Sequence, residues 1–248
     1  MKKKVIVEDI SIAHGTSSIP AKIYQERRYN VRYSMGKKGA ILRLPIHLSS
    51  AEKIQYTEQF IRWVQQQLDK RKDLAQQYQP KVYQTGDTIQ VGERTYELFV
   101  AKGDRKTHSA KVMGAMIELK LSEHQEGMAL TKSIKTLLSR VIAQDFLPEI
   151  TERVHAINHS YFQSDIKQVR LKYNRSNWGS CSSSGNINLS TRLLFAPQPV
   201  IDYVIVHELA HTKEMNHSKR FWSLVEGVMP SYKEKEKWLK KNSHLCDF

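Results

Sequence analysis

Hydrophobic and polar residues alternate in short runs through the first half of the chain, which is the pattern of half-buried β-strands. Turn signals separate neighbouring runs. Gly36-Lys37-Lys38-Gly39 lies between two of them and Gly92-Glu93 between another pair, as in hairpins. This half therefore predicts one or more small sheets. The runs that predict strands are residues 4–12, 29–33, 40–46, 88–91, 95–101 and 112–121.

Two longer segments place hydrophobic residues three or four positions apart, which predicts amphipathic helices. One runs from Ser50 to Leu74, with Ser49 or Ser50 as its cap. The other runs from Gln125 to His159 and contains Pro148, where we expect a kink or a break.

The change from strand to helix patterns near residue 125 predicts an α+β fold in two regions. We expect a β-rich region with one long helix over residues 1–124 and a second region with several helices and a small sheet over residues 125–248. No Pro/Gly/Ser-rich linker separates them, so we expect the two regions to pack together.

A strongly apolar run at 200–206 leads directly into the motif H-E-x-x-H, and Pro197 just before it suits a helix start. On a helix, His207 and His211 would lie on one face with their β-carbons about 6 Å apart, close enough to bind one metal ion. Glu208 would point about 100° around the helix, where a carboxylate can reach a water on the metal without binding the metal itself.

A third ligand is needed, because catalytic zinc usually has three protein ligands and one water. His217 lies six residues past His211, and Asn216 is the residue between them most able to turn the chain in a left-handed conformation. A helical pattern follows, so His217 would lie at the start of another helix. The histidine spacing equals that of metzincins, but Glu214 stands where their glycine permits the turn, which argues against a true metzincin.

The alternative interpretation of this motif is a chance match in which buried histidines only form hydrogen bonds. The helical context and the third histidine favour a metal site. His155 and His159 are also four residues apart on a helical pattern, but Ala156 stands where a glutamate would be. We expect a structural role for that pair.

Upstream, Asn177-Trp178-Gly179-Ser180-Cys181 and the run 186–190 predict a turn, a hairpin and a strand. Two interpretations remain open: the strand borders the cleft and pairs with an extended peptide substrate, or the hairpin belongs to the core. We expect Cys181 to be a small buried thiol and Trp178 to be a core aromatic.

Composition adds that the chain is an ordinary globular protein of 248 residues, 40% hydrophobic and 26% charged. No apolar run is long enough to cross a membrane, and two cysteines suit a reducing compartment, so we expect a cytoplasmic protein. The net charge of +14 permits contact with nucleic acid or a nucleotide, although a basic surface can also serve solubility alone. We hypothesise that Arg27-Arg28, Lys37, Lys38 and Arg43 dock an anionic surface.

Several segments of the second region form a recognisable set: Trp178-Gly179-Ser180-Cys181, residues 185–189, Pro197, Tyr203-Val204, residues 207–211 and residues 216–222. Together they resemble the YgjP-like metallopeptidase family, strongly over residues 165–241 and more weakly before them. The resemblance implies that residues 125–248 form a zincin-like, metal-binding catalytic domain related to SprT-like and WLM proteases. It also implies zinc as cofactor, with His207, His211 and His217 as ligands and Glu208 as base. One departure is Asn177, where the family often has arginine; Arg175 is the nearby substitute.

Three functions follow from these motifs. The first is a zinc metallopeptidase acting on a peptide or protein. The second is a metal-dependent nucleotide phosphohydrolase (a pyrophosphatase), for which Lys213, Lys219 or Arg220 would lie near the substrate phosphates. The third is a non-catalytic basic binding protein that retains a zincin fold. The substrate, the oligomeric state and any activating partner are open at this stage.

Overall fold

The computed structural model describes residues 5–15, 17–36, 39–71, 78–79, 81–174 and 176–248. Contacts divide the chain into two compact units, Met1–Val82 and Tyr83–Phe248. This division differs from the expected boundary at residue 124/125, because strands placed in the β-rich region share a hydrophobic core with the later helices. The fold is α+β with mixed sheets.

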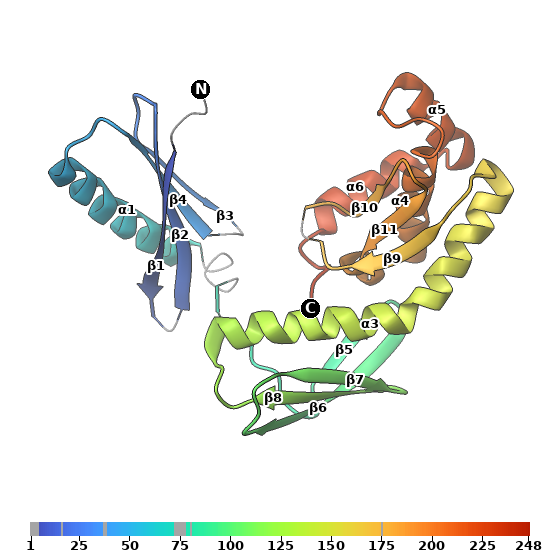
Figure 1. The fold of residues 1–248 in the computed structure, drawn as a ribbon, viewed down its shortest axis with the longest axis horizontal. Helices are drawn as coiled ribbons and strands as arrows, with labels where there is room; N and C mark the ends of the chain where they lie inside the picture. The colour runs from blue at the N-terminus through green and yellow to red at the C-terminus, as the bar shows by residue number, and fades with distance from the viewer. Residues whose placement is uncertain (1–4, 16, 37–38, 72–77, 80, 175) are drawn as a thin grey trace. The chain divides into compact units, whose positions relative to one another are not determined.

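The first unit is a four-stranded sheet with one long helix (Figure 1). The strand order is β1-β2-β4-β3; β2 and β4 are parallel and the outer pairs are antiparallel. The predicted hairpin after Gly36 is confirmed, because Gly36 pairs with Gly39. Lys37 and Lys38 lie outside the described residues. The elements are β1 Ile6–His14, β2 Ser17–Glu26, β3 Arg32–Gly36, β4 Gly39–Pro45 and α1 Ser50–Lys70.

Helix α1 buries Phe60, Val64 and Leu68 against one face of this sheet. Of the two caps that the sequence allowed, Ser49 and Ser50, the structure has Ser49 as the N-cap. It forms a capping box with Glu52, which was not predicted. The expected helix ran to Leu74, and residues 72–77 lie outside the described residues.

Strand β2 occupies the middle of the sheet and was not predicted from the sequence. Its alternation is clear, with Ile19, Ala21 and Ile23 buried, but it contains Pro20, a residue usually confined to edge strands. The strand expected at 29–33 is β3, displaced toward residue 36.

The second unit begins with another four-stranded sheet, in the order β5-β6-β8-β7. The predicted hairpin of β5 and β6 is confirmed. The prediction of a single strand at 112–121 is wrong, because this segment belongs to a hairpin of β7 and β8. The hairpin turns at Gly114, whose φ of +62° is a conformation that glycine adopts readily. The strands are β5 Thr88–Val91, β6 Arg94–Gly103, β7 Ser109–Met113 and β8 Met116–Ser122.

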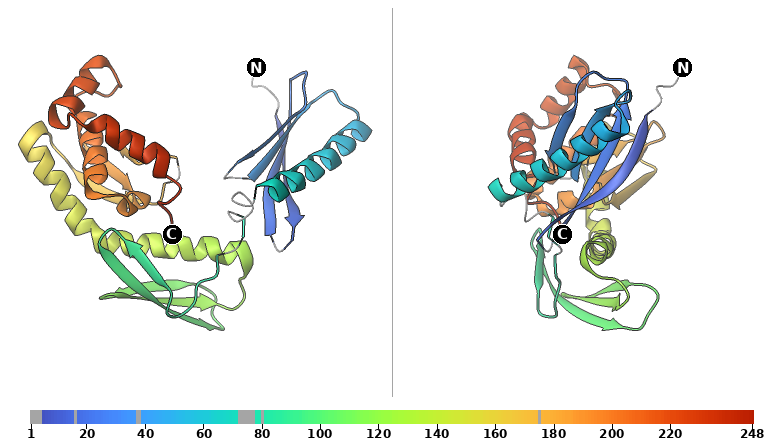
Figure 2. Two further views of the ribbon diagram at one scale, coloured as in Figure 1. Left: turned by 180° about the vertical axis from the view of Figure 1, so that it is seen from behind. Right: turned by 90° about the vertical axis from the view of Figure 1, so that its left-hand side faces the viewer.

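Helix α3 (Gly127–Ile157) packs on this sheet and continues past Pro148 as one helix, so the break that the sequence allowed does not occur. The helix bends along its length (Figure 1). It runs into a turn of π-helix, η1 (Asn158–Phe162), which ends at Gln163 with a φ of +50°. Figure 2 shows α3 extending from the β5–β8 sheet to the later helices.

The last part of the unit has a three-stranded sheet in the order β10-β11-β9 and three α-helices. Residues from α3, this sheet and α4 form one continuous core with the β5–β8 sheet. Within the described chain, no helix is long and apolar enough to cross a membrane. The elements are β9 Gln168–Lys172, β10 Gly179–Cys181, β11 Asn186–Ser190, η2 Thr191–Phe195, α4 Gln198–Ala210, α5 Lys219–Val228 and α6 Tyr232–Asn242.

Candidate metal centre

Helix α4 carries the H-E-x-x-H motif at its C-terminal end. His207 and Glu208 lie in its last turn and His211 is its C-cap. Pro197 is its N-cap, so the helix starts where the sequence predicted. Most of the helix is buried, including Val204, Ile205 and Val206. A helix packed on several sides holds these side chains in a fixed position.

The turn after α4 returns His217 toward the other two histidines without a left-handed residue. The amides of Thr212 and Lys213 bond to the carbonyls of Leu209 and Ala210, which tightens the end of the helix. Among the described residues, Gln163 is the one non-glycine with positive φ, so the left-handed Asn216 expected from the sequence is wrong. Ser218 then caps α5, which places His217 beside the start of that helix.

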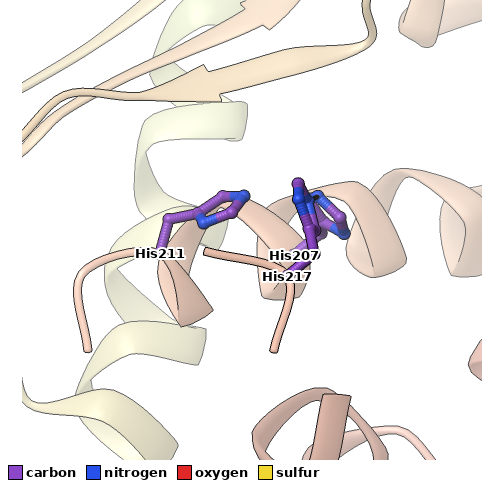
Figure 3. A group of neighbouring side chains, drawn as sticks. All are labelled: His207, His211 and His217. Atoms are coloured by element: carbon purple, nitrogen blue, oxygen red, sulfur yellow. Dashed lines mark hydrogen bonds between the residues drawn. The ribbon is translucent and has the colours of Figure 1, made fainter. Parts of the chain in front are cut away.

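The three imidazoles lie together, with one ligand-type nitrogen from each within 4.8 Å of the others. Figure 3 shows the rings of His207, His211 and His217 grouped at the end of α4. The Nε2 atoms of His207 and His217 are 3.0 Å apart. Two zinc–nitrogen bonds of about 2.0–2.1 Å at a tetrahedral angle would separate their nitrogens by about 3.3 Å. The donor set therefore fits a zinc ion.

Local hydrogen bonds decide which nitrogens face the centre. His211 Nδ1 is 3.2 Å from the Glu214 carbonyl oxygen, so Nδ1–H donates and Nε2 is left as a lone-pair donor. His207 Nδ1 is buried and has no partner in the described structure. Burial, with His211 and His217 adding to it, lowers the pKa of His207 to about 4. Neutral imidazole is the form that binds metal.

Phe221 forms an apolar surface against the three histidines. Its ring centroid lies 4.9 Å from that of His207, 4.5 Å from His211 and 4.7 Å from His217. The side chain is fully buried, so it restricts water on its side of the centre.

Glu208 is a buried carboxylate, only 5% exposed. Burial raises its pKa to about 8. A cation among the three imidazoles would lower that pKa, because it favours the charged carboxylate. A carboxyl group held in an apolar site close to metal ligands is suited to accept and release a proton.

Strand β10 passes directly against Glu208 at Gly179. A β-carbon on Gly179 would lie 2.5 Å from Glu208 Oε1 and 2.7 Å from its Cγ. Gly179 therefore lets the strand approach the carboxylate. The sequence shows the glycine but gives no sign of this contact.

Comparison with known proteins gives a family for the whole arrangement. The sequence model of the YgjP-like metallopeptidase domain matches residues 28–242, which is most of the chain. The chain belongs to the YgjP-like metallopeptidase family. The resemblance seen in the sequence is confirmed, and the family supports a metal-dependent hydrolase.

Comparisons with individual proteins and with solved structures cover a smaller part of the chain. A 58-residue segment is 36% identical to the UTP pyrophosphatase of Escherichia coli (strain K12); the match covers 23% of this chain and 35% of that relative. The chain thus spans about a third of the relative's length. Among solved structures, the metallopeptidase zymogen of Pyrococcus abyssi abylysin is similar (26% identity, TM-score 0.34, 37% of this chain, 93% of that chain). The metallopeptidase zymogen of Methanocaldococcus jannaschii jannalysin is also similar (23% identity, TM-score 0.33, 39% of this chain, 96% of that chain).

The other residues that the sequence singled out lie outside the group of three histidines. Trp178 packs on the core and has the Arg192 guanidinium 4.9 Å from its ring centroid. Cys181 is half-buried, and burial, with Glu208 adding to it, raises the pKa of its thiol to about 11. His155 and His159 are both exposed, on α3 and η1. Arg175 lies outside the described residues.

A hydrogen-bond network that sequence reasoning missed supports the turn after His211. The buried Asn158 side chain donates to the Ser164 carbonyl at 2.8 Å and accepts from the Ser164 amide at 3.0 Å. Ser164 Oγ lies 2.7 Å from Thr212 Oγ1, and Thr212 Oγ1 donates to the Leu209 carbonyl at 2.6 Å. The end of α3 is thereby tied to the turn between the ligand candidates.

Proposed function

We propose that this YgjP-like protein is a zinc-dependent metallopeptidase. His207, His211 and His217 would hold the zinc and Glu208 would act as the base. The observation that carries the proposal is the convergence of three imidazole nitrogens within 4.8 Å, one residue away from a buried carboxylate. Three neutral nitrogen ligands leave a fourth position of a tetrahedral zinc open, as in catalytic sites.

Zinc bound there would supply a Lewis acid that polarises a carbonyl and acidifies water. Glu208 would accept the proton of the attacking water at a carboxylate oxygen and later deliver it to the leaving amine. Phe221 would exclude water from its side of the site. The bond from His211 Nδ1 to the Glu214 carbonyl would hold that ring in the ligand orientation.

Strand β10 supports a peptide as substrate. It lies at the end of the order β10-β11-β9, and among the described strands none pairs with its outer edge. An extended peptide could add to this edge by main-chain hydrogen bonds and so pass close to Glu208, which contacts β10 at Gly179.

Nucleotide pyrophosphate hydrolysis is the second candidate, and two observations favour it. A segment of the chain matches a relative named UTP pyrophosphatase. Lys213, Lys219 and Arg220, close in sequence to His217, are all exposed and could contact phosphates.

One substrate screen separates these functions. The zinc-loaded protein is assayed against a peptide library and against nucleoside triphosphates, with and without chelator, beside Glu208→Gln. Chelator-sensitive peptide cleavage that the variant lacks would support the metallopeptidase. If the protein releases pyrophosphate from a nucleotide and cleaves no peptide, nucleotide pyrophosphate hydrolysis would replace the metallopeptidase proposal. A protein that binds zinc but turns over neither class would instead be the binding protein with a zincin fold.

A further inference from the structure

The positive charge of the chain is concentrated in the unit that lacks the candidate metal centre. Residues 1–82 contain 16 lysines and arginines against 7 acidic residues, a net charge of +9. Residues 83–248 contain 23 against 18, a net charge of +5, in twice the length. The charge excess therefore calls for an explanation outside catalysis.

One face of the sheet in this unit is open. Helix α1 covers one face of the sheet (Figure 1). That face carries the buried residues Ile23 and Leu42. The opposite face presents Lys22 and Tyr24 of β2, with Arg43 and Arg32 on the neighbouring strands, and each of these is exposed or half-exposed. No other helix lies in the described part of residues 5–82.

Tyr24, Arg43 and Arg32 form a row across three adjacent strands. Arg43 pairs in register with Tyr24 on one side and with Arg32 on the other. The Arg43 guanidinium lies 4.6 Å from the centroid of the Tyr24 ring. Two arginines directly opposite one another on paired strands repel, and an anion bound between them would remove that repulsion.

Acidic residues neutralise only part of this surface. Lys22 pairs with Asp9 of β1 at 2.8 Å. Arg28 and Arg43 share one carboxylate oxygen of Glu26, at 3.1 Å each. Arg27 and Arg32 are exposed, and neither has an acidic partner among the described residues. The face and its adjoining loop thus retain positive charge.

Exposed aromatic surface lies within the same segment. Tyr29, in the loop between β2 and β3, is 95% exposed. Single-stranded nucleic acid is bound by exposed aromatic rings, on which its bases stack, together with arginines, which bind its phosphates. Tyr29 and the arginines without acidic partners supply both kinds of group. In a duplex the bases stack on one another, so a duplex could interact with the arginines through its phosphates but could not stack on Tyr29.

We propose that the open face of the β1–β4 sheet, with the loop at 27–31, binds single-stranded nucleic acid. Arg27, Arg32 and Arg43 contact phosphates, and Tyr29 stacks on a base. The earlier hypothesis of an anionic partner also named Lys37 and Lys38, which lie outside the described residues. The proposal uses no residue of the candidate metal centre, so it is independent of the proposed hydrolysis.

The test measures the binding of the full chain to fluorescently labelled single-stranded RNA, and to single-stranded and duplex DNA of the same sequence, by anisotropy at several salt concentrations. The double variant Arg27→Ala/Arg32→Ala removes two charges from the surface. Its matched control, Arg62→Ala/Lys70→Ala, removes two charges from the exposed side of α1. Tyr29→Ala tests stacking separately. Circular dichroism checks that each variant folds.

We expect the wild type to bind a single strand more tightly than the duplex. The surface variant should lose about tenfold in affinity, and its salt dependence should fall by about 0.7 per phosphate contact removed. The control should stay within about twofold, and Tyr29→Ala should lose about fivefold or more. RNA and DNA arms show which sugar is preferred. Absent binding at low salt, equal losses in surface variant and control, or a preference for duplex would each overturn the proposal.

Discussion

At the residue scale, the buried carboxylate of Glu208 faces a strand that carries no side chain at the point of contact. The histidine spacing was visible in the sequence because helical geometry relates positions four apart. The contact with Gly179 was not, since it joins residues 29 positions apart through the packing of β10 on α4. Sequence patterns predict local geometry better than such tertiary contacts.

Glu208→Gln separates proton transfer from metal binding. Glutamine has nearly the same shape but cannot accept a proton, so zinc content should stay and turnover should fall about hundredfold or more. The measurement is zinc content together with steady-state kinetics on the substrate found in the screen. Full activity with zinc retained would remove Glu208 as the base, and loss of zinc would make it a ligand or a support for one.

Gly179→Ala should destabilise the protein through Glu208. The added β-carbon has no room beside the carboxylate, and overpacking of this kind costs about 1–3 kcal/mol. Denaturant unfolding is measured for this variant in the natural background and in Glu208→Ala. The cost should largely disappear in Glu208→Ala, where the obstructing atoms are gone. An equal cost in both backgrounds would show that the glycine serves another purpose.

At the element scale, the turn between α4 and α5 brings the third histidine to the other two. The sequence predicted both helices and their order, but the turn is made by bonds at the end of α4 instead of a left-handed Asn216. The β7–β8 hairpin was also missed, although Gly114 marks its turn. Apolar residues continue on both sides of this glycine, so the segment resembles one strand. In both segments the sequence predicted the position of the turn less well than it predicted the helices and strands beside it.

Thr212→Val should weaken zinc binding without unfolding the protein. It removes the hydroxyl that bonds to Leu209 and Ser164 and so loosens the turn between His211 and His217. We expect about tenfold weaker affinity by chelator competition, as for other groups that orient ligands indirectly. Thr136→Val is the control, because the Thr136 hydroxyl also bonds to a backbone carbonyl but is exposed on α3, away from the metal centre. Unchanged zinc affinity in Thr212→Val would show that the network serves stability alone.

At the scale of the whole molecule, the chain divides at Val82/Tyr83, and all residues of the candidate metal centre lie in the second unit. The boundary expected near residue 125 followed a change from strand to helix patterns. Such a change does not reveal that the β5–β8 sheet packs on α3, because which elements share a core depends on contacts distant in sequence.

A fragment of residues 83–248 should fold and bind zinc. It contains a continuous hydrophobic core and the three histidines. Circular dichroism, thermal unfolding and zinc analysis of the purified fragment measure this. We expect cooperative unfolding and about one zinc per fragment. A fragment without cooperative unfolding would show that the second unit depends on the first.

Zinc analysis of the full chain and of His217→Ala tests the central claim most directly, that three histidines hold one catalytic metal ion. We expect about one zinc per native chain and, because two histidines alone hold zinc poorly, a much weaker affinity in the variant. His159→Ala is the control, since this exposed histidine lies outside the group of three. Full zinc occupancy at unchanged affinity in His217→Ala would contradict the account and make Glu214 or Glu226 the candidate third ligand.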